Sequence, residues 1–241
     1  MSKLSFIQKD DIKIAYRYYK RNKKTVIFLH GLMSDMTGSK SKFFNKFCQI
    51  NNLSFICFDF RGHGRSSGKI TDFGVSDWFN DLKLIIINLK INKPILIGSS
   101  MGGWVAMSYA LHNPNKVLKL IGIAPAPDFT TELLWKKFTK QQKLKIKNKK
   151  IIENKINKNF SYFYSYNLFK NSKNKLLKNN KKIFKGETVL FHGSKDKVVP
   201  LDYNKGLIFK KNFMNLIMIT IKGADHSMSD NDSLQTIIKF I

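Results

Sequence analysis

The fold expected for this chain follows from one stretch, Gly98-Ser99-Ser100-Met101-Gly102. An apolar run at residues 94–97 precedes this stretch, and a helix-like run at residues 104–111 follows it. A G-x-S-x-G pattern between a strand and a helix is typical of a very tight turn, which only small neighbours allow and which exposes the serine hydroxyl at the top of a sheet. The pattern also occurs by chance. It therefore predicts Ser100 as a nucleophile only if matching partners occur elsewhere in the chain.

The expected partners of Ser100 occur downstream in the required order. A nucleophilic serine needs a histidine base and a carboxylate that orients the histidine, and around this kind of turn the chain order is serine, acid, histidine. Asp196 follows the strand-like run 188–192, and His226 follows the apolar run 216–221. Open α/β sheets build their sites from side chains at the carboxyl ends of strands. The sequence therefore predicts a catalytic triad of Ser100, Asp196 and His226.

Other residues compete for the two partner roles. Asp196 also suits a plain turn, because Gly-Ser-Lys-Asp is favourable turn chemistry. Asp225 is the alternative acid, although it is adjacent to His226 and is expected to point away from it. If neither aspartate serves, Asp128 is the next candidate. The other histidines lie in turns, near a helix end or within a strand and are expected to be structural: His30, His63, His112 and His192.

An oxyanion hole is also expected near the serine. The tetrahedral intermediate of acyl transfer carries a negative oxygen, and losing one hydrogen-bond donor to it costs about 3–4 kcal/mol. One donor is expected to be the backbone N–H of Met101, directly after the nucleophile. The loop after residues 25–29 supplies the other, because Gly31 lets this loop fold close to the serine. The N–H of Leu32 is the best candidate there.

Several strings match a known superfamily when they are taken together with the serine turn. They are His30-Gly31, Phe58-Asp59-Phe60-Arg61-Gly62-His63-Gly64-Arg65-Ser66, Gly193-Ser194-Lys195-Asp196 and His226. Together they resemble the α/β-hydrolase superfamily over nearly the whole chain. The resemblance implies that Ser100, Asp196 and His226 occupy the catalytic positions.

A narrower resemblance rests on residues 31–40, 98–104 and 122–130. These strings are similar to the mitochondrial-type palmitoyl-protein thioesterases and acyl-glucuronide esterases and to their bacterial relatives. That family implies hydrolysis of thioesters or activated esters. The middle third of the chain departs from the family pattern, and it is the part in which preference for acyl-chain length and headgroup would be set.

Strand-like and helical runs alternate along the chain. Such alternation predicts the α/β-hydrolase fold class, with a mainly parallel central sheet and helices on both faces. We find no repeat and no linker rich in Pro, Gly or Ser, so residues 1–241 are predicted to form a single α/β-hydrolase domain. Strands are expected at 12–19, 25–29, 54–60, 95–98, 117–124, 188–192 and 216–221, and helices at 42–49, 76–89, 102–111, 203–209 and 233–241.

Residues 126–185 are predicted to be a lysine-rich helical lid inserted between two strands of the sheet. Leu133, Leu134, Trp135 and Phe138 open the insertion at helical spacing, and five aromatic residues follow within 160–166. A lid of this kind excludes water and holds an acyl chain, and Trp135 and Phe138 are the expected substrate-binding residues. The alternative is that these aromatic side chains only tether the insertion to the core.

The chain carries a formal net charge of +27, with 43 Lys and Arg residues against 16 Asp and Glu. All but four of these cations are lysines, whereas nucleic-acid sites rely more on arginine, so we interpret the charge as the codon usage of an AT-rich genome and expect no nucleic-acid partner. The charge is uneven, however. Residues 136–185 hold 17 Lys and a single acid, Glu153. A nucleic-acid or anionic-surface binder therefore stays open as a further interpretation.

The sequence shows no secretory signal, no apolar run of transmembrane length and only two cysteines, Cys48 and Cys57, which predicts a cytoplasmic protein without a transmembrane anchor. The favoured function is a serine hydrolase that cleaves carboxylic esters or thioesters through an acyl-enzyme, with a small-molecule or acyl-protein substrate. No cofactor and no metal are expected. The alternative is a catalytically silent scaffold that binds a ligand or partner. The oligomeric state is left open.

Overall fold

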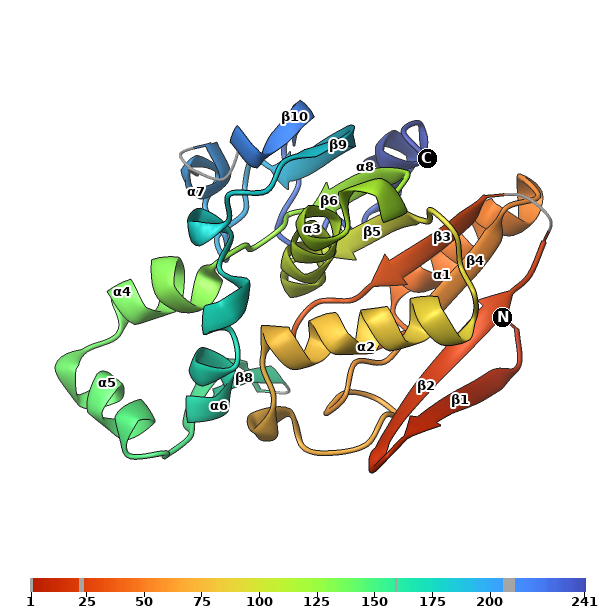
Figure 1. Cartoon of the computed structure of the whole chain (residues 1–241). Coiled ribbons are helices and arrows are strands. Elements are labelled where there is room, and N and C mark those ends of the chain that lie inside the picture. The colour runs from red at the N-terminus through yellow and green to blue at the C-terminus, as the bar shows by residue number, and fades with distance from the viewer. Residues whose placement is uncertain (1, 22–23, 159, 206–210) are drawn as a thin grey trace.

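A mostly parallel sheet forms the centre of the molecule (Figure 1). The computed structural model describes residues 2–21, 24–158, 160–205 and 211–241. Within these residues the sheet contains, in spatial order, β1 (Leu4–Lys9), β2 (Ile12–Tyr19), β4 (Ser54–Phe58), β3 (Thr25–Leu29), β5 (Ile95–Ser99), β6 (Lys119–Ile123), β9 (Phe184–Gly193) and β10 (Phe213–Ile221). β2 pairs antiparallel with β1 and β4, and the other neighbours run parallel.

The inner strands are buried along nearly their whole length, as sheets covered on both faces require. That burial explains why these strands read as continuous apolar runs in the sequence. The prediction of an α/β-hydrolase fold with a mainly parallel sheet is confirmed. β1 was not predicted.

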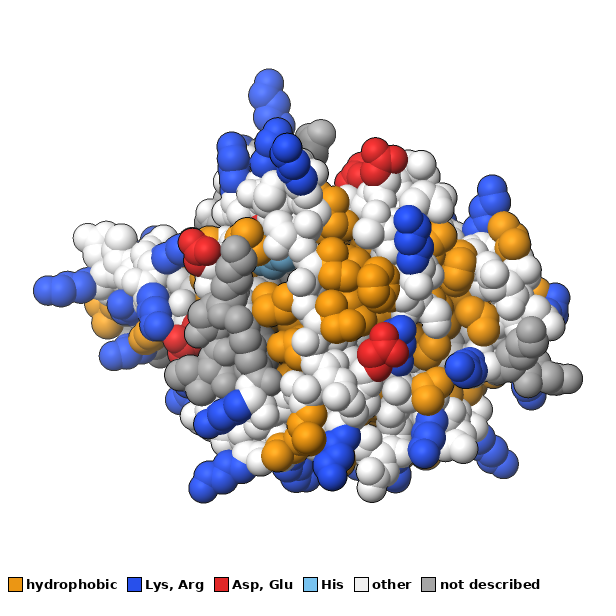
Figure 2. Space-filling model, turned by 90° about the horizontal axis from the view of Figure 1, so that it is seen from above, with side chains coloured by type: hydrophobic (Ala, Val, Ile, Leu, Met, Phe, Trp, Pro, Cys, Tyr) orange, Lys and Arg blue, Asp and Glu red, His pale blue; other side chains and the backbone are white. Residues whose placement is uncertain are grey.

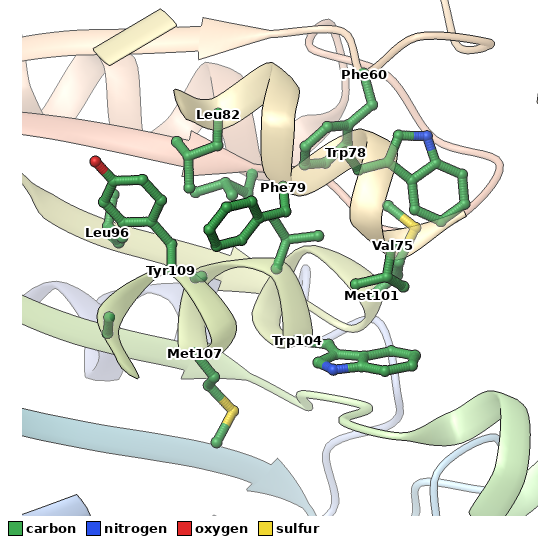
Figure 3. Packing of buried hydrophobic residues seen from close by; sticks show 14 of the residues in the cluster. Phe60, Val75, Trp78, Phe79, Leu82, Leu96, Met101, Trp104, Met107 and Tyr109 are labelled. Carbon is green, nitrogen blue, oxygen red and sulfur yellow. The ribbon is translucent and has the colours of Figure 1, made fainter. Parts of the chain in front are cut away.

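Helices cover both faces of the sheet. On one face, α1 (Ser39–Ile50) and α8 (Asn231–Ile238) lie over a buried apolar cluster, and on the other face α2 (Val75–Asn88) and α3 (Met101–His112) lie over a second cluster. Figure 3 shows Trp78 and Phe79 of α2 packed close to α3, and the rings of Phe79 and Tyr109 lie 5.7 Å apart. This packing fixes α3, which begins directly after Ser100.

The remaining short elements outside the insertion are two 3₁₀ helices, η1 (Ile70–Asp72) and η2 (Pro114–Lys116), and the α-helix α7 (Leu201–Lys205). The predicted helix at 203–209 corresponds to α7, but it begins earlier, at Leu201. Residues 206–209 of that prediction lie outside the described residues.

The segment between β6 and β9 corresponds to the predicted helical insertion, but it contains a β-hairpin as well as helices. It contains η3 (Thr130–Leu134), α4 (Trp135–Lys137), α5 (Lys140–Lys147), the hairpin strands β7 (Ile152–Asn157) and β8 (Phe160–Tyr164), α6 (Tyr166–Lys170), η4 (Lys173–Lys175) and η5 (Leu177–Asn179). Phe160, Tyr162 and Tyr164 recur every second residue, which places them on one face of a strand. The aromatic run is therefore half of an antiparallel hairpin.

Lysine and arginine side chains dominate the charged surface. In Figure 2 they project around the whole rim of the face shown, with few acidic side chains among them, while hydrophobic side chains gather near its middle. This distribution agrees with the net charge of +27.

Candidate active site

Ser100 occupies a strained turn between β5 and α3. Its backbone angles are φ 53° and ψ −117°, a left-handed region that residues with a side chain seldom adopt. A Cβ atom on Gly98 would overlap the backbone of Gly102, and a Cβ atom on Gly102 would overlap the carbonyl groups of Leu29 and His30. The two glycines are therefore required by close backbone approach, and the approach pushes the serine hydroxyl away from the sheet.

The three residues predicted as a triad lie within hydrogen-bonding distance of one another. The Nε2 atom of His226 lies 3.0 Å from the Oγ atom of Ser100, and its Nδ1 atom lies 2.8 Å from the Oδ2 atom of Asp196. Ser100 follows β5, Asp196 follows β9 and His226 follows β10. The carboxyl ends of three parallel strands thus bring the nucleophile, base and acid positions together.

Asp196 is held by more donors than a plain turn would supply. Its Oδ1 atom accepts hydrogen bonds from the backbone N–H groups of Val198 (2.9 Å) and Val199 (2.8 Å). Its Oδ2 atom lies 3.3 Å from the Nε2 atom of His192 in addition to its contact with His226. Burial opposes ionisation of this carboxylate, but the hydrogen bonds from His192 and His226 outweigh burial and hold its pKa below the usual range. Asp196 therefore stays ionised, as an acid that orients a histidine must.

His192 is a site residue that the sequence reasoning treated only as structural. It is buried, its Nε2 atom lies 2.7 Å from the carbonyl oxygen of Val199, and its Nδ1 atom lies 3.0 Å from the side-chain nitrogen of Asn204. Since the amide of Asn204 donates to Nδ1, the ring proton resides on Nε2, where the carbonyl oxygen of Val199 is the nearer acceptor and the Oδ2 atom of Asp196 the more distant one. The spacing of four residues between His192 and Asp196 was the only signal in the sequence.

The competing acids are engaged elsewhere. The Oδ1 atom of Asp225 accepts a hydrogen bond from the backbone N–H of Met228 at 3.0 Å. The carboxylate of Asp128 is buried and accepts hydrogen bonds from the N–H groups of Leu177 (2.7 Å) and Lys178 (2.9 Å) at the other end of the insertion. Asp128 thus connects two parts of the chain, and neither of its two hydrogen bonds involves His226.

The predicted oxyanion residues lie beside Ser100. Leu32 and Met101 line the same pocket as the serine, and the N–H of Met101 belongs to the first turn of α3, where helical partners are absent. The carboxylate of Asp59 fastens the surrounding loops, because it accepts hydrogen bonds from the N–H groups of Met36 (2.7 Å) and Arg65 (2.9 Å). Leu32 and Met101 thus lie at the pocket that contains the serine, and their role as oxyanion donors stays a prediction.

Two pockets open on either side of Ser100. The first is mainly apolar, and the side chains that line it with the serine include Ala126, Phe129, Leu133, Leu134, Ile156, Tyr162, Tyr164 and Val199. The second has more hydroxyl and charged side chains in its lining, which include Ser34, Asp35, Ser39, Lys40, Asp225, His226, Ser227 and Ser229. Leu32, Ile156, Tyr162 and Val198 line both pockets together with Ser100, so the two pockets adjoin at the serine.

Trp135 and Phe138 lie outside the residues that line the apolar pocket. The ring of Trp135 contacts Phe169 at a centroid distance of 5.5 Å, and the ring of Phe138 contacts Phe169 at 5.8 Å and Tyr164 at 5.9 Å. Their neighbours Leu133, Leu134 and Lys137 line the pocket instead. The segment turns one face to the pocket and the other to α6, and sequence spacing alone did not distinguish the two faces.

The described residues contain neither a metal-binding cluster nor a membrane-spanning helix. Among the described residues, no cluster of His, Cys, Asp and Glu has the arrangement to hold a metal ion. None of the helices in this part of the chain is long and apolar enough to cross a membrane.

The sheet order, the strained serine turn and the Ser–His–Asp contacts define the class of this protein as an α/β hydrolase. A family model described as serine aminopeptidase, S33, matches residues 20–183, and the chain belongs to this family of hydrolases. The predicted superfamily resemblance is therefore confirmed.

Curated relatives and solved structures refine the comparison. The chain is 29% identical to the mitochondrial palmitoyl-protein thioesterase ABHD10 of Rattus norvegicus, over 98% of the chain and 80% of the relative. It superimposes on alpha/beta hydrolase domain-containing protein 10 from mouse with a TM-score of 0.88 at 28% identity, covering 99% and 96% of the two chains. A protein from Agrobacterium vitis S4 has the same fold, with a TM-score of 0.89 at 24% identity and coverage of 99% and 97%. The predicted resemblance to mitochondrial-type thioesterases is confirmed.

Proposed function

We propose that this protein is a serine hydrolase that cleaves carboxylic esters or thioesters through an acyl-enzyme. The observation that carries the proposal is the chain of contacts from Asp196 through His226 to Ser100. In the proposed reaction the Oγ atom of Ser100 attacks the acyl carbonyl while His226 takes its proton. The N–H groups of Leu32 and Met101 stabilise the oxyanion. His226 then protonates the leaving group and activates the water that releases the acyl chain.

The two pockets suggest how a substrate lies across Ser100. An acyl chain suits the apolar pocket, where Leu134, Phe129 and Tyr164 provide apolar surface. The leaving group then occupies the second pocket, which offers hydroxyl groups and Lys40. Names of the relatives support a fatty acyl thioester as one substrate class, either as a small molecule or on a protein.

In this proposal residues 126–185 act as a lid within one hydrolase domain. The β7–β8 hairpin supports this role, because Asn154, Ile156, Tyr162 and Tyr164 all line the apolar pocket. Trp135 and Phe138 then support the lid from behind through their contacts with Phe169 and Tyr164. Closing the pocket would exclude water from the acyl-enzyme.

The experiment that tests the function is a substrate series with two versions of the protein. Turnover of p-nitrophenyl esters and acyl-coenzyme A thioesters of graded chain length is measured for the wild type and for Ser100→Ala, with an aminoacyl p-nitroanilide as the peptidase comparator. We expect ester and thioester turnover that Ser100→Ala lowers by about 10⁶-fold, and covalent labelling of the wild type alone by a fluorophosphonate. Ser108→Ala, a change in a buried serine of α3 that lines neither pocket, is the matched control and should retain activity.

Other results would contradict the proposal in distinct ways. Turnover of the anilide alone would favour a peptidase. Absence of both turnover and labelling would favour the catalytically silent scaffold. The contacts among Ser100, His226 and Asp196 give no support to that alternative.

The cytoplasmic location stays a prediction. Both cysteines are buried and unpaired, and burial raises the pKa of Cys48 to about 12 and that of Cys57 to about 11, so both are inert thiols that suit a reducing compartment. The Rattus norvegicus relative, by contrast, is named as a mitochondrial protein.

A further inference from the structure

Lysines surround two exposed apolar side chains where the apolar pocket opens to solvent. Ile156 of β7 and Val198 after β9 both line the pocket, yet their exposed fractions are 53% and 47%. Lys137 and Lys197 line the same pocket and are exposed, and Lys155, next to Ile156, is exposed as well. We refer to these five residues as the mouth. Its chemistry is that of an apolar centre with a cationic rim.

The basic surface continues from the mouth along the insertion. Helix α5 packs against β7 and carries the exposed Leu144 among lysines, and the exposed Ile151 follows it. Residues 136–185 have a net charge of +16, which leaves +11 for the other 191 residues. The one acid of this segment, Glu153, already accepts a hydrogen bond from Ser161 at 2.7 Å. The positive charge is therefore concentrated on the segment that encloses the pocket.

A lipid surface with anionic headgroups matches both halves of this chemistry. Lysines near such a surface are attracted to its headgroups, and apolar side chains beside them bury in the boundary between headgroups and acyl chains. A nucleic acid would use the lysines but would offer nothing to Ile156 and Val198. The segment 136–185 also contains no arginine, the cation that nucleic-acid sites use for bidentate contacts.

We propose that the mouth docks on an anionic phospholipid bilayer, with Ile156 and Val198 entering the headgroup region and the lysines facing the phosphates. A long acyl chain then reaches the apolar pocket without crossing water. That last step rests on the proposed function, whereas docking itself requires no catalysis. The substrates implied are acyl groups carried at a membrane surface.

The test is a vesicle flotation assay with the full chain carrying Ser100→Ala, so that no substrate is turned over. Vesicles of phosphatidylcholine alone are compared with vesicles that also contain phosphatidylglycerol, at low and high salt. We expect binding only to the anionic vesicles, weakened by salt. Neutralising Lys137, Lys155 and Lys197 to Gln should weaken binding by about fivefold for each lysine. The paired change Ile156→Ser and Val198→Ser should weaken it by about tenfold.

Matched controls separate docking from the general charge and folding of the protein. Lys90→Gln, Lys93→Gln and Lys116→Gln remove the same charge from exposed positions outside the insertion, and Ile87→Ser changes an isoleucine with 60% exposure on α2. Each of these control variants should bind the anionic vesicles within about twofold of the parent protein, because a charge away from the docking surface contributes only a screened, long-range attraction.

Three results would overturn the proposal: equal binding to both kinds of vesicle, losses in the controls as large as those in the mouth variants, or tighter binding to duplex DNA that the Ile156→Ser and Val198→Ser pair leaves unchanged. Failure of docking would leave hydrolysis of soluble p-nitrophenyl esters untouched. Conversely, a protein that docks but turns over no ester would retain this inference and lose the proposed function.

Discussion

The ends of β5, β9 and β10 and the inserted segment 126–185 hold their side chains by different means. At the strand ends, backbone groups hold the side chains of the site in place. Asp196 accepts hydrogen bonds from two backbone N–H groups, and a methyl group at Gly102 would overlap the neighbouring backbone. In the insertion, side chains are held mostly by ring contacts and by partly exposed ion pairs such as Lys178–Glu132. The comparison teaches that the proposed catalytic site is held by the backbone, which tolerates few changes, while the proposed acyl-binding surface is held by side chains that can be replaced singly.

The largest effect that would test this comparison is at Asp196. Asp196→Asn removes the charge and presents an amide to His226, so we expect turnover of a p-nitrophenyl ester to fall by about 10⁴-fold, because the histidine adopts the wrong tautomer. Asp225→Asn, one residue before His226, is the matched control and should cost less than about tenfold. If the two effects are reversed, the acid is misassigned. Steady-state kcat for both variants decides the matter.

The next effect is on folding at Gly102. A methyl group there would overlap the carbonyl groups of Leu29 and His30, so Gly102→Ala should lower the free energy of unfolding by at least about 3 kcal/mol. Gln141→Ala, at an exposed position of α5 in the insertion, should change it by less than about 0.5 kcal/mol. Urea denaturation measures both. Equal losses would show that the strand ends and the insertion are equally constrained.

The third prediction concerns pH and the buried ring of His63 beside the strand ends. Burial lowers the pKa of His63 to about 3 from an ordinary value of 6.5. Between these values the unfolded chain binds a proton that the folded chain does not, so stability falls as pH is lowered, by about 1.4 kcal/mol per pH unit for this group. His63→Phe should remove that share of the slope between pH 6 and pH 4, measured by urea unfolding. An unchanged slope would mean that His63 titrates normally in the fold.

The smallest predicted effect is on acyl-chain selectivity in the insertion. Leu134 lines the apolar pocket, so Leu134→Ala should lower kcat/KM for a long acyl chain by about tenfold relative to a short one. Trp135→Ala should leave that ratio within about twofold, because its ring contacts Phe169 outside the pocket. The opposite ranking would return the acyl-binding role to Trp135, as the sequence had suggested.

The two regions also differed in how far the sequence could be interpreted. The serine turn, its two glycines and the order of Asp196 and His226 are local patterns with a physical reason for each residue type. They predicted the fold, and the structure brings Ser100, Asp196 and His226 into contact. The hairpin was missed because Phe160, Tyr162 and Tyr164 were interpreted by composition, although their period of two indicates a strand. β1 is a short, half-exposed edge strand, so it lacks the continuous apolar run that identified β3 and β5.

Residues that act through tertiary contacts could not be found in the same way. The contact of His192 with Asp196 depends on how the chain turns after β9, and the choice between Leu134 and Trp135 depends on which face of the segment meets the pocket. Neither arrangement is determined by local sequence. Both become clear only when neighbouring elements are in place.

The path of the chain into and out of the insertion has a consequence for exchange between related proteins. The insertion leaves the sheet at β6 and returns at β9, which are hydrogen-bonded neighbours, and the carboxylate of Asp128 joins its beginning to Leu177 and Lys178 near its end. Both ends are thus anchored at one place on the scaffold. A foreign segment of another length could be grafted between those anchor points without moving a strand, so if the insertion acts as the proposed lid, one continuous piece of gene would transfer its substrate preference.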